Sequence, residues 1–161
     1  MNKYITLFAL ATLANIECEA QPNAAVPRLV VGITVDQLNS DDMEQFAALY
    51  GNGGFKKLLR EGVVYENAQY DFAPINLASA TTAIATGASP VDNGITAERW
   101  VSRETLRPVG CTFDKKFFVS PNNVKSSTIG DEMKMASNGN ALVFSVAANQ
   151  DAAVLQGGHA A

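Results

Sequence analysis

The amino-acid sequence predicts an α/β fold in which a doubly wound, mostly parallel sheet is flanked by helices. Residues 29–35 and 141–147 are nearly continuous apolar runs, which is typical of parallel strands buried on both faces. Residues 63–70 are rich in β-branched and aromatic side chains and alternate in polarity, which predicts a further strand. Helical patterns separate these segments, and strands that alternate with helices indicate a parallel sheet covered on both faces.

Two helices are predicted between the first two strands. Residues 40–50 carry a polar cap followed by apolar residues at helical spacing, and the glycine-rich residues 51–54 end this helix. A second helix, residues 55–60, is expected to end at Gly62, because glycine is favoured directly after a helix. Its predicted buried side chains are Phe55, Leu58 and Leu59.

The second half of the chain adds two more predicted helices. Residues 76–86 are rich in Ala, Ser and Thr and predict a tightly packed helix closed by Gly87. Residues 100–123 show no clear period and predict a long surface excursion. Ser127 is suited to cap a helix over residues 128–137, and the last strand follows it.

Residues 1–20 predict a secretory signal peptide. Lys3 provides a positive start, residues 4–13 are an apolar stretch, and Ala20 is a small residue suited to cleavage before Gln21. The stretch is too short for a membrane span. The alternative is an N-terminal helix of the mature fold. The signal peptide predicts a periplasmic or secreted protein.

Charge and cysteine content limit the possible partners. The formal net charge is −4, without a basic cluster, so we expect no nucleic-acid-binding surface. Cleavage of the leader would leave Cys111 alone in an oxidising compartment. Cys111 would then either form a disulfide with a cysteine further along a longer chain or be a buried cysteine without a disulfide. Because residues 156–161 directly follow the last predicted strand and a turn, we expect residues 28–161 to be the N-terminal part of a longer, truncated domain. Oligomeric state is not predicted.

Two motifs connect the chain to a known family. Residues 53–62 (GGFKKLLREG) and 83–95 (AIATGASPVDNGI), in that order, resemble the alkaline phosphatase superfamily. The likeness is closest to its single-domain phosphatase and nucleotide pyrophosphatase/phosphodiesterase branch. The resemblance implies metal-dependent hydrolysis of a small phosphoester, usually with zinc. It also implies that Asp36, at the end of the first predicted strand, is a metal ligand. The alternative is that Asp36 only binds loop amides.

The resemblance places the nucleophile, a Thr or Ser in the family, at Leu77. An aliphatic side chain has no oxygen for attack at phosphorus. Ser79 lies about 200° around the helix from that position, and Thr81 lies roughly 6 Å further along the axis. Ser79 is therefore only a weak substitute, and the alternative interpretation of this helix is small-residue packing.

Three phosphate-binding positions differ as well. An Asn of the family falls on Glu98, and a Lys and an Arg fall on Asn149 and Asp151. A phosphate dianion would meet repulsion where the family provides attraction. The only histidine, His159, is expected to be structural rather than a metal ligand.

These observations leave rival hypotheses. The leading one is a secreted alkaline-phosphatase-family protein that is divergent at its nucleophile and does not hydrolyse phosphoesters by itself. One alternative is an active hydrolase that uses another nucleophile or a zinc-bound hydroxide. The other is a pseudoenzyme that keeps the fold to bind a partner. The substrate and the number of metals are not predicted.

Overall fold

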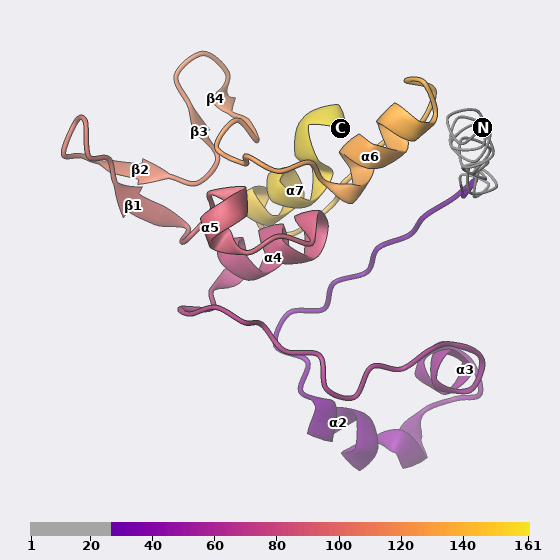
Figure 1. The fold of residues 1–161 in the computed structure, drawn as a ribbon. Helices are drawn as coiled ribbons and strands as arrows, with labels where there is room; N and C mark the ends of the chain where they lie inside the picture. Colours follow the sequence, from indigo (N-terminus) through magenta and orange to yellow (C-terminus); the bar gives the residue numbers. More distant parts are fainter. Residues whose placement is uncertain (1–26) are drawn as a thin grey trace, which may run out of the picture. The chain divides into compact units, whose positions relative to one another are not determined.

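A computed structural model describes residues 27–161 (Figure 1), of which residues 31–161 group into one unit. The predicted signal peptide lies outside the described residues. Within residues 27–161, no helix has both the length and the apolar character needed to cross a bilayer.

The helices follow the predicted order in the first half. Helix α2 is Ser40–Gln45 and is followed by the 3₁₀ turn η1, Ala47–Leu49. The cap of α2 is Asn39, whose side chain accepts the backbone N–H of Asp41, one residue before the predicted cap. Helix α3 is Gly54–Glu61 and ends at Gly62 as predicted.

The later helices differ more from the predictions. Helix α4, Leu77–Thr86, ends at Gly87, where φ is +66°, and the four-residue helix α5, Pro90–Asn93, follows. Helix α6, Ile129–Ala136, is capped by Thr128 rather than by Ser127. Helix α7, Gln150–Gly157, and the 3₁₀ turn η2, Gly158–Ala160, were not predicted.

Most residues of the predicted surface excursion 100–123 are exposed, and the segment contains two small antiparallel sheets that were not predicted. Strands β1, Arg99–Val101, and β2, Pro108–Gly110, pair with Trp100 opposite Val109. Strands β3, Phe113–Asp114, and β4, Phe118–Val119, pair next along the chain. The four strands are only two or three residues long, which is too short for a period of two to be recognised in the sequence.

The predicted parallel sheet is absent from the part of the chain that the structure describes. Residues 29–35, 63–70 and 141–147 belong to neither sheet, and residues 63–70 include a turn at Glu66 and Asn67. Side chains expected to be buried are exposed; Leu142, Phe144 and Val146 are 78%, 83% and 94% exposed. A parallel strand needs neighbours on its edges and helices on both faces. In residues 141–146, the alternate side chains Ala141, Val143 and Ser145 are half-buried and the others are exposed, so only one face is covered.

The core is small and lies in the second half of the chain. Its buried members are Ala78, Ile95, Cys111, Val124 and Leu155, with Trp100 packed against them. Helix α4 packs against α5 and α7 and contributes Ala78 to this core (Figure 1). The side chains Phe55, Leu58 and Leu59 of α3 are exposed, contrary to the prediction.

Candidate functional site

Leu77 is the first residue of α4. The preceding residue, Asn76, is the N-cap, and its side-chain oxygen accepts the backbone N–H of Ser79 at 3.0 Å. The Ser79 hydroxyl in turn accepts the backbone N–H of Asn76 at 3.0 Å, which completes a capping box. The start of α4 is thus fixed by Asn76 and Ser79, and the side chain of Leu77 takes no part in it.

Three of the four hydroxyl side chains of α4 are buried, and the fourth, Thr86, is half-buried. Ser79 and Thr82 are fully buried and Thr81 is almost so. The Ser79 hydroxyl also lies 3.2 Å from the carbonyl oxygen of Asn76, and the Thr82 hydroxyl donates to the carbonyl of Ala78 at 2.8 Å. These contacts agree with the interpretation of this helix as small-residue packing and give Ser79 no exposed oxygen.

Hydrogen bonds at Asn76, which precedes Leu77, at Glu98 and at Asp151 join the elements that carry the other family positions. The side-chain amide of Asn76 donates to the carbonyl of Thr96 at 3.0 Å. Two residues further on, the carbonyl of Glu98 accepts the backbone N–H of Cys111 at 2.8 Å. The next residue after Cys111, Thr112, donates its hydroxyl to the carboxylate of Asp151.

Helix α7 brings the last two positions to this region. Asn149 caps α7 by accepting the backbone N–H of Ala152 at 3.1 Å, and Asp151 lies in its first turn. Because α7 packs against α4, the helix that starts at Leu77 is also in contact with the one that carries Asp151. The structure thus connects Leu77, Glu98 and Asp151 through adjoining elements.

Cys111 is fully buried and has no disulfide partner among residues 27–161. Burial is the main reason that the pKa of its thiol is raised to about 12, and the negative charge of Asp151 adds to the effect. The thiol therefore stays protonated and unreactive at neutral pH. Of the two sequence hypotheses, a buried cysteine agrees with this environment.

Asp36 does not end a buried strand. It lies in an exposed turn with Gln37, whose φ is +60°, after the extended residues 29–35. The same segment is connected to α7 by the side-chain amide of Gln156, which donates to the Thr34 hydroxyl at 2.8 Å.

Residues 27–161 do not provide the ligand set of a divalent metal. Nowhere in this range do three or more His, Cys, Asp or Glu side chains come together as a possible metal site. Zinc sites in proteins use three or four such ligands. Asp36 is a single carboxylate in a solvent-exposed turn, and one such ligand is not enough to hold a metal ion.

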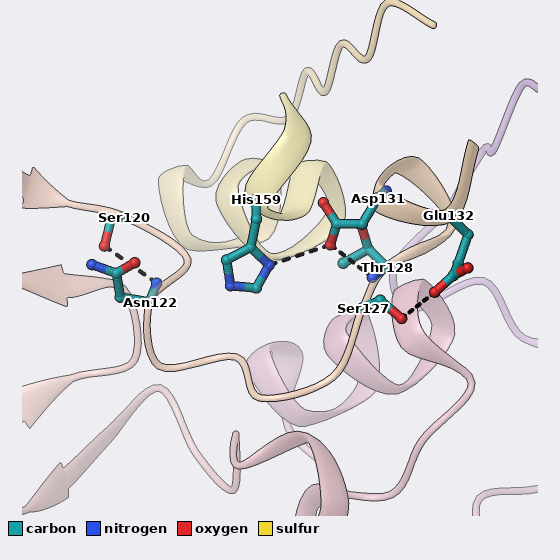
Figure 2. Close-up of polar contacts among 7 residues, drawn as sticks. All are labelled: Ser120, Asn122, Ser127, Thr128, Asp131, Glu132 and His159. Carbon is teal, nitrogen blue, oxygen red and sulfur yellow. Dashed lines mark hydrogen bonds and ion pairs between the residues drawn. The ribbon is translucent and has the colours of Figure 1, made fainter. Parts of the chain in front are cut away.

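A polar cluster that sequence reasoning missed lies at the start of α6 (Figure 2). Asp131, which is only 9% exposed, accepts the backbone N–H of Thr128 at 2.8 Å, and its Oδ2 lies 3.2 Å from His159 Nδ1. The spacing of Thr128 and Asp131 is that of a capping box, and this signal was present in the sequence. His159 is thus part of a structural contact, as expected of a lone histidine.

Comparisons with known proteins agree with the resemblance. Residues 30–155 match the family model of type I phosphodiesterase / nucleotide pyrophosphatase. The chain is 38% identical over 147 residues to alkaline phosphatase PhoV of Synechococcus elongatus, covering 85% of this chain and 27% of PhoV. It is 36% identical over 153 residues to alkaline phosphatase PafA of Elizabethkingia meningoseptica, covering 87% of this chain and 28% of PafA.

A solved structure supports the same relationship. The crystal structure of wild-type PafA aligns with 84% of this chain and 28% of its own length, with a TM-score of 0.78 and 34% identity. The alkaline-phosphatase-like fold is therefore confirmed for this segment, although its parallel sheet is not formed in the described residues. The chain spans little more than a quarter of the length of these relatives.

Proposed function

Because the chain belongs to the type I phosphodiesterase / nucleotide pyrophosphatase family, we propose that it is part of a secreted, metal-dependent phosphoester hydrolase fold that has lost its nucleophile. By itself this chain does not hydrolyse phosphoesters. We further propose that residues 29–35, 63–70 and 141–147 are strands of a doubly wound, mostly parallel sheet in the complete fold.

The observation that carries the proposal is Leu77 at the first position of α4. The unpaired backbone amides of a helix start favour an anion, so a phosphoester would be attracted there. Covalent phosphoryl transfer nevertheless needs an oxygen nucleophile at that point. The nearest hydroxyl group in the helix, that of Ser79, is buried in the capping box.

The charge at the neighbouring positions supports the same conclusion. Glu98 and Asp151 introduce two carboxylates where the resemblance implies an amide and a cation. Neither compensates the charge that develops on the phosphoryl oxygens during transfer, which normally requires donors or cations. The site therefore has neither a nucleophile for attack at phosphorus nor a group that stabilises the charge developing on the phosphoryl oxygens.

The metal belongs to the proposal for the complete protein. We assign Asp36 as one ligand of a divalent metal, zinc by resemblance, with the remaining ligands outside this chain. A zinc ion would supply Lewis-acid chemistry at a phosphoryl oxygen.

Secretion is tested by mass spectrometry of the mature N-terminus: a start at Gln21 supports the signal peptide, and an intact Met1 contradicts it.

The decisive experiment restores the hydroxyl group in the complete protein. Leu77→Thr should increase zinc-dependent hydrolysis of p-nitrophenyl phosphate or its diester by at least an order of magnitude. Leu77→Val is the matched control, because valine has nearly the shape of threonine without the hydroxyl group. A gain in both variants would indicate a packing effect, and a gain in neither would contradict a dormant catalytic site.

The second candidate function is a binding module. The contact of the Asp151 carboxylate with the Thr112 hydroxyl argues against a part for Asp151 in hydrolysis and is compatible with this function. If Leu77→Thr gives no gain and the purified complete protein contains no zinc, this function replaces the first. Stoichiometric zinc in the purified protein would instead favour the hydrolase fold.

A further inference from the structure

The start of α6 and the end of α7 meet through a buried carboxylate. The backbone N–H of Thr128 donates to Asp131 Oδ2 at 2.8 Å, and the backbone N–H of Asp131 donates to the Thr128 hydroxyl at 3.2 Å. His159, 28 residues further along the chain, places its Nδ1 3.2 Å from the same Oδ2 atom (Figure 2). One oxygen atom therefore closes a helix cap and holds a separate turn.

The backbone at Gly158, where η2 begins directly after α7, fits closely against this carboxylate. A Cβ atom at Gly158 would lie 2.2 Å from the Thr128 hydroxyl oxygen and 2.8 Å from Asp131 Oδ2. The φ angle of Gly158 is +71°, in the region that favours glycine. The η2 turn can approach the α6 cap only because residue 158 has no side chain.

The first turn of α6 carries two acidic side chains, Asp131 and Glu132. The neighbouring acid Glu132 bonds to the Ser127 hydroxyl and is exposed (Figure 2), whereas Asp131 is buried. Burial by itself raises the pKa of Asp131, but the hydrogen bonds from Thr128 and His159 outweigh it, so the pKa is lowered overall. The ionised carboxylate is thus the form that this arrangement stabilises.

We propose that Asp131 and His159 form a latch that holds the C-terminal end of α7 on the start of α6. Helix α7 is then anchored at both ends, since Asp151 in its first turn is bound by Thr112. An eight-residue helix is a rigid rod of roughly 12 Å. The latch therefore positions Asp151 in the candidate site. This consequence rests on the proposed function, whereas the latch itself does not.

A double-mutant cycle on the full chain tests the latch. Asp131→Asn and His159→Ala should each raise the unfolding equilibrium constant in urea, and the increase in the double variant should be about tenfold smaller than the product of the two single increases. The matched control pairs Glu132→Gln with His159→Ala, for which the effects should multiply. His159→Asn keeps a donor near the position of Nδ1. It should therefore recover part of the stability that His159→Ala loses.

The proposal is overturned if the effects of Asp131→Asn and His159→Ala on the unfolding equilibrium constant simply multiply. It is also overturned if His159→Asn is as unstable as His159→Ala. If the variants do not fold, amide hydrogen exchange of the unmodified chain decides the question. An intact latch makes the Thr128 amide exchange together with the last amides of α7. Faster exchange of Thr128 by several orders of magnitude would contradict the latch. Neither result depends on phosphoester hydrolysis, so failure here is distinct from failure of the proposed function.

Discussion

Thr112 donates its hydroxyl group to the carboxylate of Asp151, a residue 39 positions later in the chain. Thr112 is buried and follows β2, whereas Asp151 lies in the first turn of α7. The contact connects the strand-rich segment to α7 at the position where the resemblance places a phosphate-binding cation. The acidic side chain at this position is bound by a hydroxyl group from another part of the chain.

Removal of the Thr112 hydroxyl should destabilise the protein. Thr112→Val preserves the shape but leaves the Asp151 carboxylate without this donor, at a cost of about 1–3 kcal/mol in free energy of unfolding. The urea midpoint measures the change. Thr112→Ser, which retains the hydroxyl, should lose less than the valine variant; an equal loss would mean that packing of the methyl group is responsible.

Gly158→Ala should be among the most damaging single substitutions. It combines a positive φ with a Cβ atom 2.2 Å from the Thr128 hydroxyl, so we expect a loss above about 3 kcal/mol. Gly139→Ala is the matched control: its φ is +84°, but the space around it is open. It should lose only about 1 kcal/mol by the same thermal or urea measurement. Similar losses for both would remove the argument for a close approach at Gly158.

Asn76→Ala should weaken the start of α4 by about 1–2 kcal/mol, because it removes the cap acceptor for Ser79 N–H. Asn76→Asp keeps the acceptor but loses the donor to the carbonyl of Thr96. Its loss of unfolding free energy should therefore be the smaller of the two. Equal losses for the two variants would show that the contact with Thr96, which both remove, dominates.

Acid should weaken the turn between β3 and β4. Backbone N–H groups of Phe117 and Lys116 lower the pKa of Asp114 from 3.8 to about 2. Because the folded pKa is below the unfolded one, its stabilisation is present above pH 3.8 and is lost as the pH falls toward about 2. Asp114→Asn should flatten the decline of the urea midpoint over that window. Ser120→Ala, which removes one donor to Asp114, should give an intermediate slope.

The exposed apolar side chains of residues 141–147 should make the isolated chain self-associate. Contiguous apolar surface of this kind is a common cause of aggregation. Phe144→Ser should reduce binding of an anionic naphthalene dye and shift sedimentation toward the monomer. Val143→Ser, on the half-buried face, should not improve either quantity. A monomeric wild-type chain that does not bind the dye would contradict this prediction.

The sequence predicted those elements whose signals are local. Helix α4 has its cap and terminal glycine in the sequence, and both Asn76 and Gly87 perform those roles. Helix α7 was missed because the apolar residues 141–147 were predicted to be a strand and the residues after them to be a turn. The signal was nevertheless present, since Asn149 is a favoured cap and Asp151 is an acid in the first turn.

The sheet and the site depend on contacts that are distant in the sequence. An apolar run such as residues 29–35 indicates burial but does not say what covers it, and here the side chains are exposed. The bonds of Asp131 to His159 and of Thr112 to Asp151 span 28 and 39 positions. Neither pairing follows from spacing, whereas the absence of a hydroxyl group at Leu77 follows from the sequence directly.

The capping box of α4 has an evolutionary consequence. Asn76 and Ser79 hold the helix start between them, so residue 77 contributes nothing to the geometry of the turn that presents it. Selection can therefore exchange leucine and threonine at this position without rebuilding the scaffold. Under the proposed function, replacement of the nucleophile by leucine would leave this capping box intact, and its recovery would need no compensating change elsewhere in the helix.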